Sequence, residues 1–344
     1  MKNKLLLLFF LLGVFFPLSA QESEVLISTS HTSLLLSTSQ GGELKFLYYG
    51  RKLTDADVHA IVSTESGSFS AYPVYGLNCP SESALSVQHE DGNMTLQMEV
   101  IGVETTHQEK ANLTVISLKD KVYPFYVKLC YKAYQDVDVI EAWTEISHKE
   151  KKNVKLNQFA SAYLPVRKGN VWLSSLYGAW ANEARLVQEP LEPGMKVIKN
   201  KDGVRNSHTA HAEVMFSLDG QPRENSGRVI GAALCYGGNY KLRIDTDESE
   251  YHHFYAGINE DNSVYHLKSG EVFKTPELAL TYSDEGLSGG SRNFHRWART
   301  YKLANGDKLR KILLNSWEGV YFKINESGMK QMMACLLYTS DAAD

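Results

Sequence analysis

Alternation of apolar and polar residues dominates the chain from Glu24 to Gly290. Because successive side chains of a β-strand point to opposite faces, this period of two predicts strands with one buried face. Turn sequences such as Asp91-Gly92 and Gly237-Gly238-Asn239 separate the alternating runs and predict hairpins between them. We find no helical period longer than two turns in this region. The pattern therefore predicts a mainly β fold, a large antiparallel β-sandwich.

A first helix is expected only near Gly289, where Ser291 is a suitable N-cap. Phe294, Trp297 and Ala298 then repeat at the i, i+3, i+4 spacing of one helix face. We assign residues 21–288 to the sandwich domain and residues 289–311 to a linker helix that follows it.

After the linker, Ile312–Leu314 is an unbroken apolar run, which favours a strand covered on both faces, as in a parallel sheet. Trp317 follows in a polar loop, and Asn325 is placed to cap a helix. The apolar face of that helix consists of Met329, Met332 and Met333. A strand, a loop and a helix are the first unit of a (β/α)8 barrel, whose active site is built from such loops. Residues 312–334 are therefore predicted to begin a barrel.

The first twenty residues have the layout of a secretory signal peptide. Lys2 and Lys4 precede an apolar core from Leu5 to Phe16, and small residues lead to an expected cleavage after Ala20. The core is short for a bilayer span, so we expect residues 1–20 to be removed and no membrane anchor to remain. The predicted location is the periplasm or the cell exterior.

The last ten residues, 335–344, read CLLYTSDAAD and do not continue the helical pattern that precedes them. Their sequence resembles a translated sequencing adapter, so we expect a non-native tail. A short natural terminus is the alternative.

Composition excludes several classes of function. A net charge of −4 and a pI near 6.3 leave no basic stripe, so nucleic acid is not an expected partner. The four cysteines show no CxxC spacing, and His208 and His211 would face opposite sides of a strand. We therefore predict no metal site and no cofactor. Cys130 and Cys235 lie in strand-like patterns and are expected to be buried thiols.

Several separate stretches together resemble the glycoside hydrolase family 36 α-galactosidases. The likeness extends over residues 24–334 with its motifs in the family's order, and it includes a G-x-W-x-x-E-R stretch, an SSH-like segment and the first barrel strand. The stretches are Tyr177–Arg185, Ser207–His208, Gly257–Asn259, Leu267–Glu277, Tyr282–Trp297 and Leu313–Asn325.

This resemblance implies an N-terminal β-supersandwich, a (β/α)8 catalytic barrel and a small C-terminal β domain. It also implies removal of terminal α-linked galactose from oligosaccharides, with retention and without a metal. Retention needs two carboxyl groups about 5 Å apart. The family carries both aspartates on later barrel strands, beyond this sequence. We therefore expect the N-terminal fragment of an exported α-galactosidase, truncated within the barrel, with no catalytic residue of its own and inactive alone.

Two tryptophans are the predicted substrate-binding residues. Trp317 matches the family's aromatic residue on the first barrel strand, where an indole face stacks on the sugar and the N–H donates a hydrogen bond. Trp180, with Glu183 and Arg185 nearby, either lines a cleft between sandwich and barrel or forms an interdomain packing contact. For Trp317, packing within the barrel is the alternative.

Assembly is left open. Some family members complete a neighbouring subunit's active site with a G-D-F-R-like loop, and the corresponding Tyr75–Ser81 lacks the Asp and the Arg. A homo-oligomer is therefore not specified by the sequence.

Two other classes of protein remain as alternatives. A non-catalytic carbohydrate-binding β-sandwich would have no need of the apolar unit at residues 312–334, which would expose apolar surface. A sandwich enzyme of the aldose mutarotase type would need a His/Glu acid–base pair in an open cleft, and the sequence indicates none.

Overall fold

The computed structural model describes residues 23–39, 41–64, 69–76, 82–166, 168–203, 208–311 and 313–341. The chain divides after Trp297 into two compact units. The predicted signal peptide, Ser207, Ile312 and most of the loop Tyr75–Ser81 lie outside the described residues.

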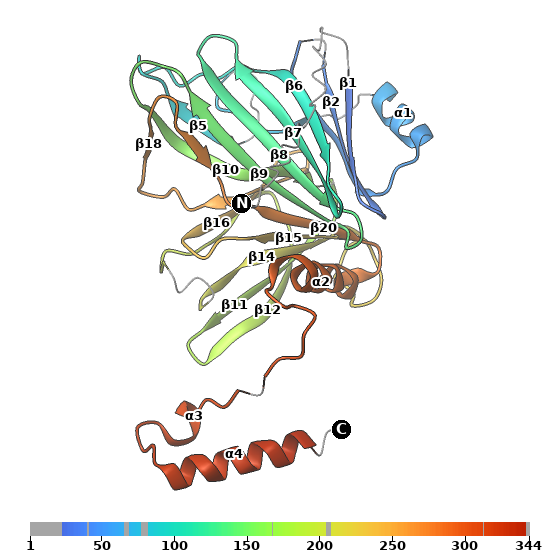
Figure 1. Ribbon diagram of the computed structural model, residues 1–344. Helices are drawn as coiled ribbons and strands as arrows, with labels where there is room; N and C mark the ends of the chain where they lie inside the picture. Colours follow the sequence, from blue (N-terminus) through green and yellow to red (C-terminus); the bar gives the residue numbers. More distant parts are fainter. Residues whose placement is uncertain are drawn as a thin grey trace, which may run out of the picture. The chain divides into compact units, whose positions relative to one another are not determined.

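Three antiparallel sheets build the first unit (Figure 1). The largest has ten strands and runs, from edge to edge, through β12 (Asn182–Pro190), β11 (Trp172–Ala179), β14 (Ala210–Ser217), β15 (Val229–Leu234), β20 (Leu278–Ser283), β9 (Val139–His148), β8 (Phe125–Tyr134), β7 (Ala111–Asp120) and β6 (Met98–His107), with β19 (Val272–Lys274) also paired to β9. This confirms the predicted antiparallel β fold.

The second sheet has six strands: β13 (Gly194–Lys199), β16 (Tyr240–Thr246), β17 (His252–Ile258), β10 (Val154–Val166), β18 (Tyr265–Leu267) and β5 (Leu85–Gln88). The third has four strands: β1 (Ser23–Ser28), β2 (Thr32–Thr38), β3 (Leu44–Arg51) and β4 (Phe69–Ser70). The largest sheet contains the hairpin β11–β12, and the second contains β16–β17, two hairpins that carry the side chains of interest.

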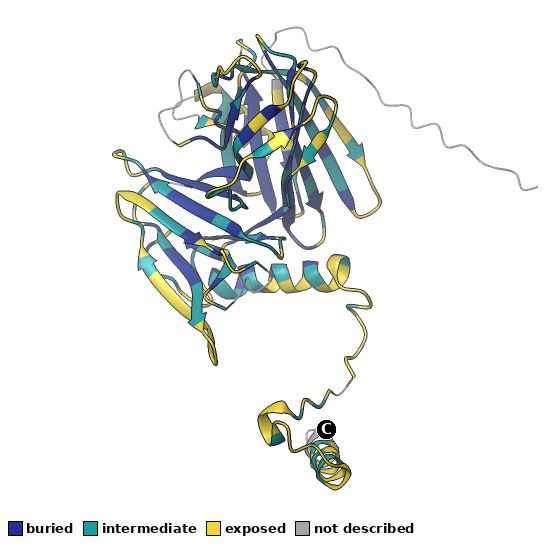
Figure 2. Ribbon diagram, turned by 90° about the vertical axis from the view of Figure 1, so that its left-hand side faces the viewer, coloured by how far each residue is buried: buried dark blue, intermediate teal, exposed yellow. Residues whose placement is uncertain are grey.

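The core follows from the alternation seen in the sequence. Leu242 and Ile244 of β16 are fully buried, whereas the intervening Arg243 points to the opposite face of its sheet. Phe216 and Phe254 meet edge to face at 5.2 Å between ring centroids and join the two larger sheets. Buried residues accordingly concentrate along the strands of this unit (Figure 2). Burial of each such ring contributes about 2–3 kcal/mol.

The described residues of the first unit form two helices. The sequence analysis did not predict α1 (Asp55–Thr64), although a capping box marks its start: the Thr54 backbone N–H donates to the Asp57 carboxylate and the Asp57 backbone N–H donates to the Thr54 hydroxyl. The second, α2 (Gly286–Trp297), begins before the predicted start near Gly289. Ser291 therefore lies inside this helix, so its predicted role as N-cap was wrong.

The second unit contains the π-helix η1 (Ala298–Lys302), the short α3 (Trp317–Val320) and α4 (Glu326–Asp341). Asn325 caps α4 as predicted, because its side-chain oxygen accepts the N–H of Gly328 at 2.8 Å. The predicted strand is not formed over residues 313–316, where no described strand pairs with the chain and Leu313 is exposed.

The C-terminal residues differ from expectation. Residues Cys335–Asp341 continue α4, so the predicted break in the helical pattern was wrong. This stretch contains Leu336 and Leu337 and no glycine or proline, so no strong helix breaker stops the helix within it. Cys130 is buried as predicted, but Cys235 is exposed because it follows the last residue of β15. None of the helices formed by the described residues is long and apolar enough to cross a membrane.

Candidate functional site

Trp180 lies at the tip of the β11–β12 hairpin. Its side chain is 80% exposed, and no aromatic ring or cation of the described residues packs against it. The next residue, Ala181, has a left-handed φ of 58°, and Ala184 has a φ of 55°. Left-handed backbone is uncommon for residues other than glycine, so two such residues within one turn form an unusual local structure.

Close packing fixes the backbone of this turn. A Cβ on Gly178 would lie 2.6 Å from the Glu183 Cα, so only glycine fits opposite the turn. The Ala181 N–H donates to Glu183 Oε1 at 3.1 Å. The other neighbour of this carboxylate is the His208 imidazole, whose Nε2 is 3.7 Å from the same oxygen.

The polar group beside Trp180 therefore differs from the one expected. Among the described residues no ion pair joins Glu183 to Arg185, because the left-handed Ala184 between them interrupts the regular alternation of the strand. Sequence reasoning did not connect His208 with Glu183. The only signal was the Ser207-His208 segment, which the resemblance singled out for other reasons.

Trp317 begins α3 in the second unit, where its backbone N–H donates to the Asn315 side-chain oxygen at 3.0 Å. Its indole contacts two further rings edge to face, with centroids 5.5 Å from Tyr321 and 5.0 Å from Phe322. Trp317 itself is 45% exposed. The two predicted tryptophans are thus separate local features, one in each unit.

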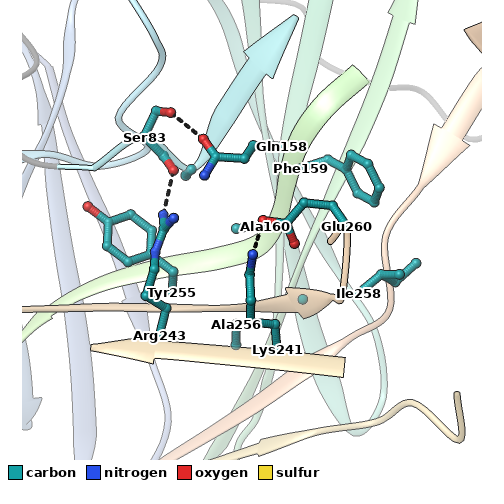
Figure 3. Close-up of a pocket in the computed structure, with 12 residues that line it drawn as sticks. Ser83, Gln158, Phe159, Ala160, Lys241, Arg243, Tyr255, Ala256, Ile258 and Glu260 are labelled. Atoms are coloured by element: carbon teal, nitrogen blue, oxygen red, sulfur yellow. Dashed lines mark hydrogen bonds and ion pairs between the residues drawn. The ribbon is translucent and has the colours of Figure 1, made fainter. Parts of the chain in front are cut away.

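A hollow on the polar face of the six-stranded sheet is the next candidate (Figure 3). Arg243 lies on the Tyr255 ring at 4.4 Å and donates to the Ser83 carbonyl at 2.8 Å. Tyr255 donates its hydroxyl to the neighbouring carbonyl of Glu82. These contacts attach the segment before β5 to the hairpin β16–β17.

The remaining groups of this hollow also bond to one another. Ser83 donates to Gln158 at 2.7 Å, and Lys241 forms an ion pair with Glu260. The free space holds about one water molecule, which is too little for a sugar ring. We therefore interpret the hollow as a structural tie between strands.

Two buried histidines lie near the end of the same hairpin. His253 Nδ1 lies 2.7 Å from the Tyr163 hydroxyl and its Nε2 lies 3.2 Å from Asp247. His252 bonds to Thr246 and to the Gly169 carbonyl, and its burial lowers its pKa. Neither histidine lies in an open cleft, so this pair does not supply the acid–base set of a mutarotase-type enzyme.

No three His, Cys, Asp or Glu side chains of the described residues are grouped to hold a metal ion. His208, which the sequence analysis did not expect to bind a metal, lies 3.7 Å from Glu183 Oε1.

Comparison with known proteins identifies the family of this chain. The family model of the glycosyl hydrolase family 36 N-terminal domain matches residues 42–268, and the melibiase model matches residues 272–336. Alpha-galactosidase Mel36A of Lactobacillus acidophilus is 32% identical over 231 residues, which cover 67% of this chain and 31% of the relative. Alpha-galactosidase AgaA of Geobacillus stearothermophilus is 30% identical over 273 residues, which cover 74% and 37%.

The chain thus spans about a third of the length of the curated relatives it matches. A crystal structure of an AgaA variant in complex with raffinose superimposes with a TM-score of 0.80 at 25% identity, covering 89% of this chain and 47% of that one. Since the N-terminal family model alone matches well over half of the residues, the chain belongs to glycosyl hydrolase family 36.

Proposed function

We propose that this chain is the N-terminal part of an α-galactosidase that hydrolyses terminal non-reducing α-D-galactosyl residues of oligosaccharides. The observation that carries the proposal is the order of the two family matches, with the N-terminal domain at residues 42–268 directly followed by melibiase at residues 272–336. A relative's crystal structure in complex with raffinose supports an oligosaccharide as the substrate class.

Retention is the proposed stereochemical course, with one carboxylate as nucleophile and a second carboxyl as acid/base about 5 Å away. Neither group is assigned to a residue of this chain. The sandwich supports the barrel, and Trp317 provides an aromatic face for the galactosyl ring. Since the chain spans about a third of its relatives, we expect the 344-residue polypeptide to be inactive alone.

Export to the periplasm or the medium is part of the same proposal. It rests on residues 1–20, where two lysines precede an apolar core and small residues precede Gln21. Mass spectrometry of the protein recovered outside the cytoplasm is expected to find Gln21 as the first residue. A retained Met1 or a cytoplasmic location would refute export.

The activity test compares two polypeptides. Purified residues 21–344 are expected to release no nitrophenol from a nitrophenyl α-galactoside. The full-length product of the natural gene is expected to hydrolyse it, with the α-anomer of galactose appearing first by NMR. Turnover by residues 21–344, or a β-anomer as first product, would contradict the proposal.

A further inference from the structure

We propose that the free edge of β12 is a self-association surface of the first unit. A second copy of the chain adds its own β12 there in antiparallel orientation, so that the largest sheet continues across a twofold axis. The two copies are joined by backbone hydrogen bonds and by matched charges. This contact is independent of the proposed hydrolysis.

The backbone of β12 has one unused side. β12 lies at one end of the ten-stranded sheet, and β11 is its only strand partner among the described residues (Figure 1). An edge strand carries a row of N–H and C=O groups that point away from its neighbour. No other described segment forms a backbone hydrogen bond with residues Asn182–Pro190. This row can therefore pair with a further strand.

The side chains of β12 leave that edge open. Every residue from Asn182 to Gln188 is exposed, with Leu186 at 58% and Val187 at 38%. Leu186 and Val187 are consecutive, so each face of the strand presents one exposed apolar side chain. Edge strands are commonly protected by a lysine, a proline or a bulge. Arg185–Glu189 contains no lysine or proline, and its register with β11 is regular.

The charges of this stretch complement themselves when two copies pair about Val187. With Val187 opposite the partner's Val187, Arg185 lies opposite the partner's Glu189, and the twofold axis repeats this pair. Opposite charges directly across two antiparallel strands are stabilising, and like charges are destabilising. An axis at Leu186 would instead set Glu183 opposite the partner's Glu189, twice. The charges therefore favour the axis at Val187.

Both members of the proposed pair have capacity for a partner. Arg185 forms no ion pair with another described residue. The Glu189 side chain is 35% exposed, and its Oε1 lies 2.6 Å from Lys196 Nζ. An ionised carboxylate accepts about four hydrogen bonds, so the partner's Arg185 can bind Glu189 without displacing Lys196.

Sedimentation velocity of the 344-residue chain tests for the dimer. One strand pairing buries less surface than the roughly 1,200 Å² of a standard interface, so the dimer is expected to be weak. A reversible monomer–dimer equilibrium is expected at concentrations up to about 200 μM.

Two charge variants test the pairing between the copies. Arg185→Glu sets carboxylates opposite each other, and Glu189→Arg sets guanidinium groups opposite each other. Each variant alone is expected to dimerise about tenfold more weakly, because both symmetry-related contacts become repulsive. An equimolar mixture of the two variants is expected to recover dimerisation, since both contacts of the mixed pair join opposite charges. A merely structural effect of either substitution would not be restored by mixing.

A cysteine on the axis tests the register. Val187→Cys places two Cα atoms about 4.5–5.5 Å apart, within reach of a disulfide, and mild oxidation is expected to give covalent dimers. Gln188→Cys is the matched control, because its Cα lies about 8 Å from the partner's equivalent atom, beyond that reach. Cys235 and Cys335 are exposed, so both variants are compared with wild type in the same oxidant.

Self-association through β12 is refuted if the wild type stays monomeric over this concentration range, or if mixing the two charge variants restores nothing. Cross-linking of Gln188→Cys as fast as Val187→Cys would also overturn it. Dimers that persist unchanged in both charge variants would place the contact elsewhere, on the exposed apolar side chains of the second unit.

Discussion

Gly286 is the residue whose replacement tests most directly how the first unit is held together. It starts α2 with a φ of 67°, and a Cβ there would lie 2.5 Å from the Arg223 carbonyl oxygen and 2.6 Å from the Ser226 nitrogen. Left-handed backbone costs an alanine about 1–2 kcal/mol before any collision is counted.

The collision affects the bonds that cap the helix. The N–H groups of Gly286, Leu287 and Ser288 donate to the carbonyls of Gly227, Arg223 and Glu224 at 3.0, 3.1 and 2.9 Å. Moving the loop to make room for a Cβ weakens these three bonds, each of which contributes about 0.5–1.5 kcal/mol. Gly286→Ala should therefore lower the free energy of unfolding by about 2–5 kcal/mol.

Urea unfolding followed by far-ultraviolet circular dichroism measures this loss. Gly102→Ala is the matched control, because nothing lies within 4 Å of its added Cβ and its φ is not left-handed. That control should raise the free energy of unfolding by about 0.4–1 kcal/mol, because alanine restricts the unfolded chain more than glycine does. A Gly286→Ala variant as stable as the control would show that the loop at residues 223–227 moves aside freely, and the reasoning would be wrong.

Two further predictions concern buried polar groups. Burial lowers the pKa of His252 below its usual value. As the pH falls, the unfolded chain therefore binds a proton at this residue before the folded chain does. The stability contributed by neutral His252 is complete above about pH 6.5 and is lost as the pH falls below that value. Thermal unfolding at about pH 7.5 and about pH 5.5 should show a smaller acid loss of Tm in His252→Gln than in wild type, and an equal loss would exclude His252 as the cause. Asp138 accepts the Thr29 hydroxyl at 2.7 Å and the His31 N–H at 2.8 Å. Asp138→Ala should therefore lower the free energy of unfolding measured in urea by about 2–4 kcal/mol. Asp138→Asn should lower it clearly less, because asparagine keeps an oxygen and tolerates the φ of 53°. Equal losses for the two variants would contradict this account.

The sandwich was predictable because its strands alternate. In β7, Ile116 and Leu118 are buried and the intervening Ser117 is only partly buried, so a period of two in the sequence translates directly into one buried face. The helix α1 was missed because it buries only Val58 and therefore leaves no apolar period; the capping box of Thr54 and Asp57 was the available signal. The start of α2 was misplaced because its cap consists of backbone carbonyls from a distant loop, which no local pattern records.

The candidate site was predictable only in part. Trp180 and Trp317 were found as tryptophans in family-like motifs, and both remain predictions as substrate-binding residues. The approach of His208 to Glu183 depends on how β14 pairs with β11, a contact between segments far apart in the sequence. The strand expected at residues 312–314 needs a neighbouring strand for its backbone bonds, and apolar composition alone does not supply one.

The position of β20 in the largest sheet has a consequence for biosynthesis. This strand lies between β15 and β9, and its pairing of Thr281 with Val139 joins residues far apart in the chain (Figure 1). β8 pairs with one edge of β9 early, but a ribosome must complete nearly the whole first unit before β20 can pair with the other edge, and the nascent chain carries that open sheet edge until then. Such long-range closure folds slowly, which gives chaperones a long interval in which to bind the unfolded chain, and it leaves the unpaired edge prone to aggregation if they do not.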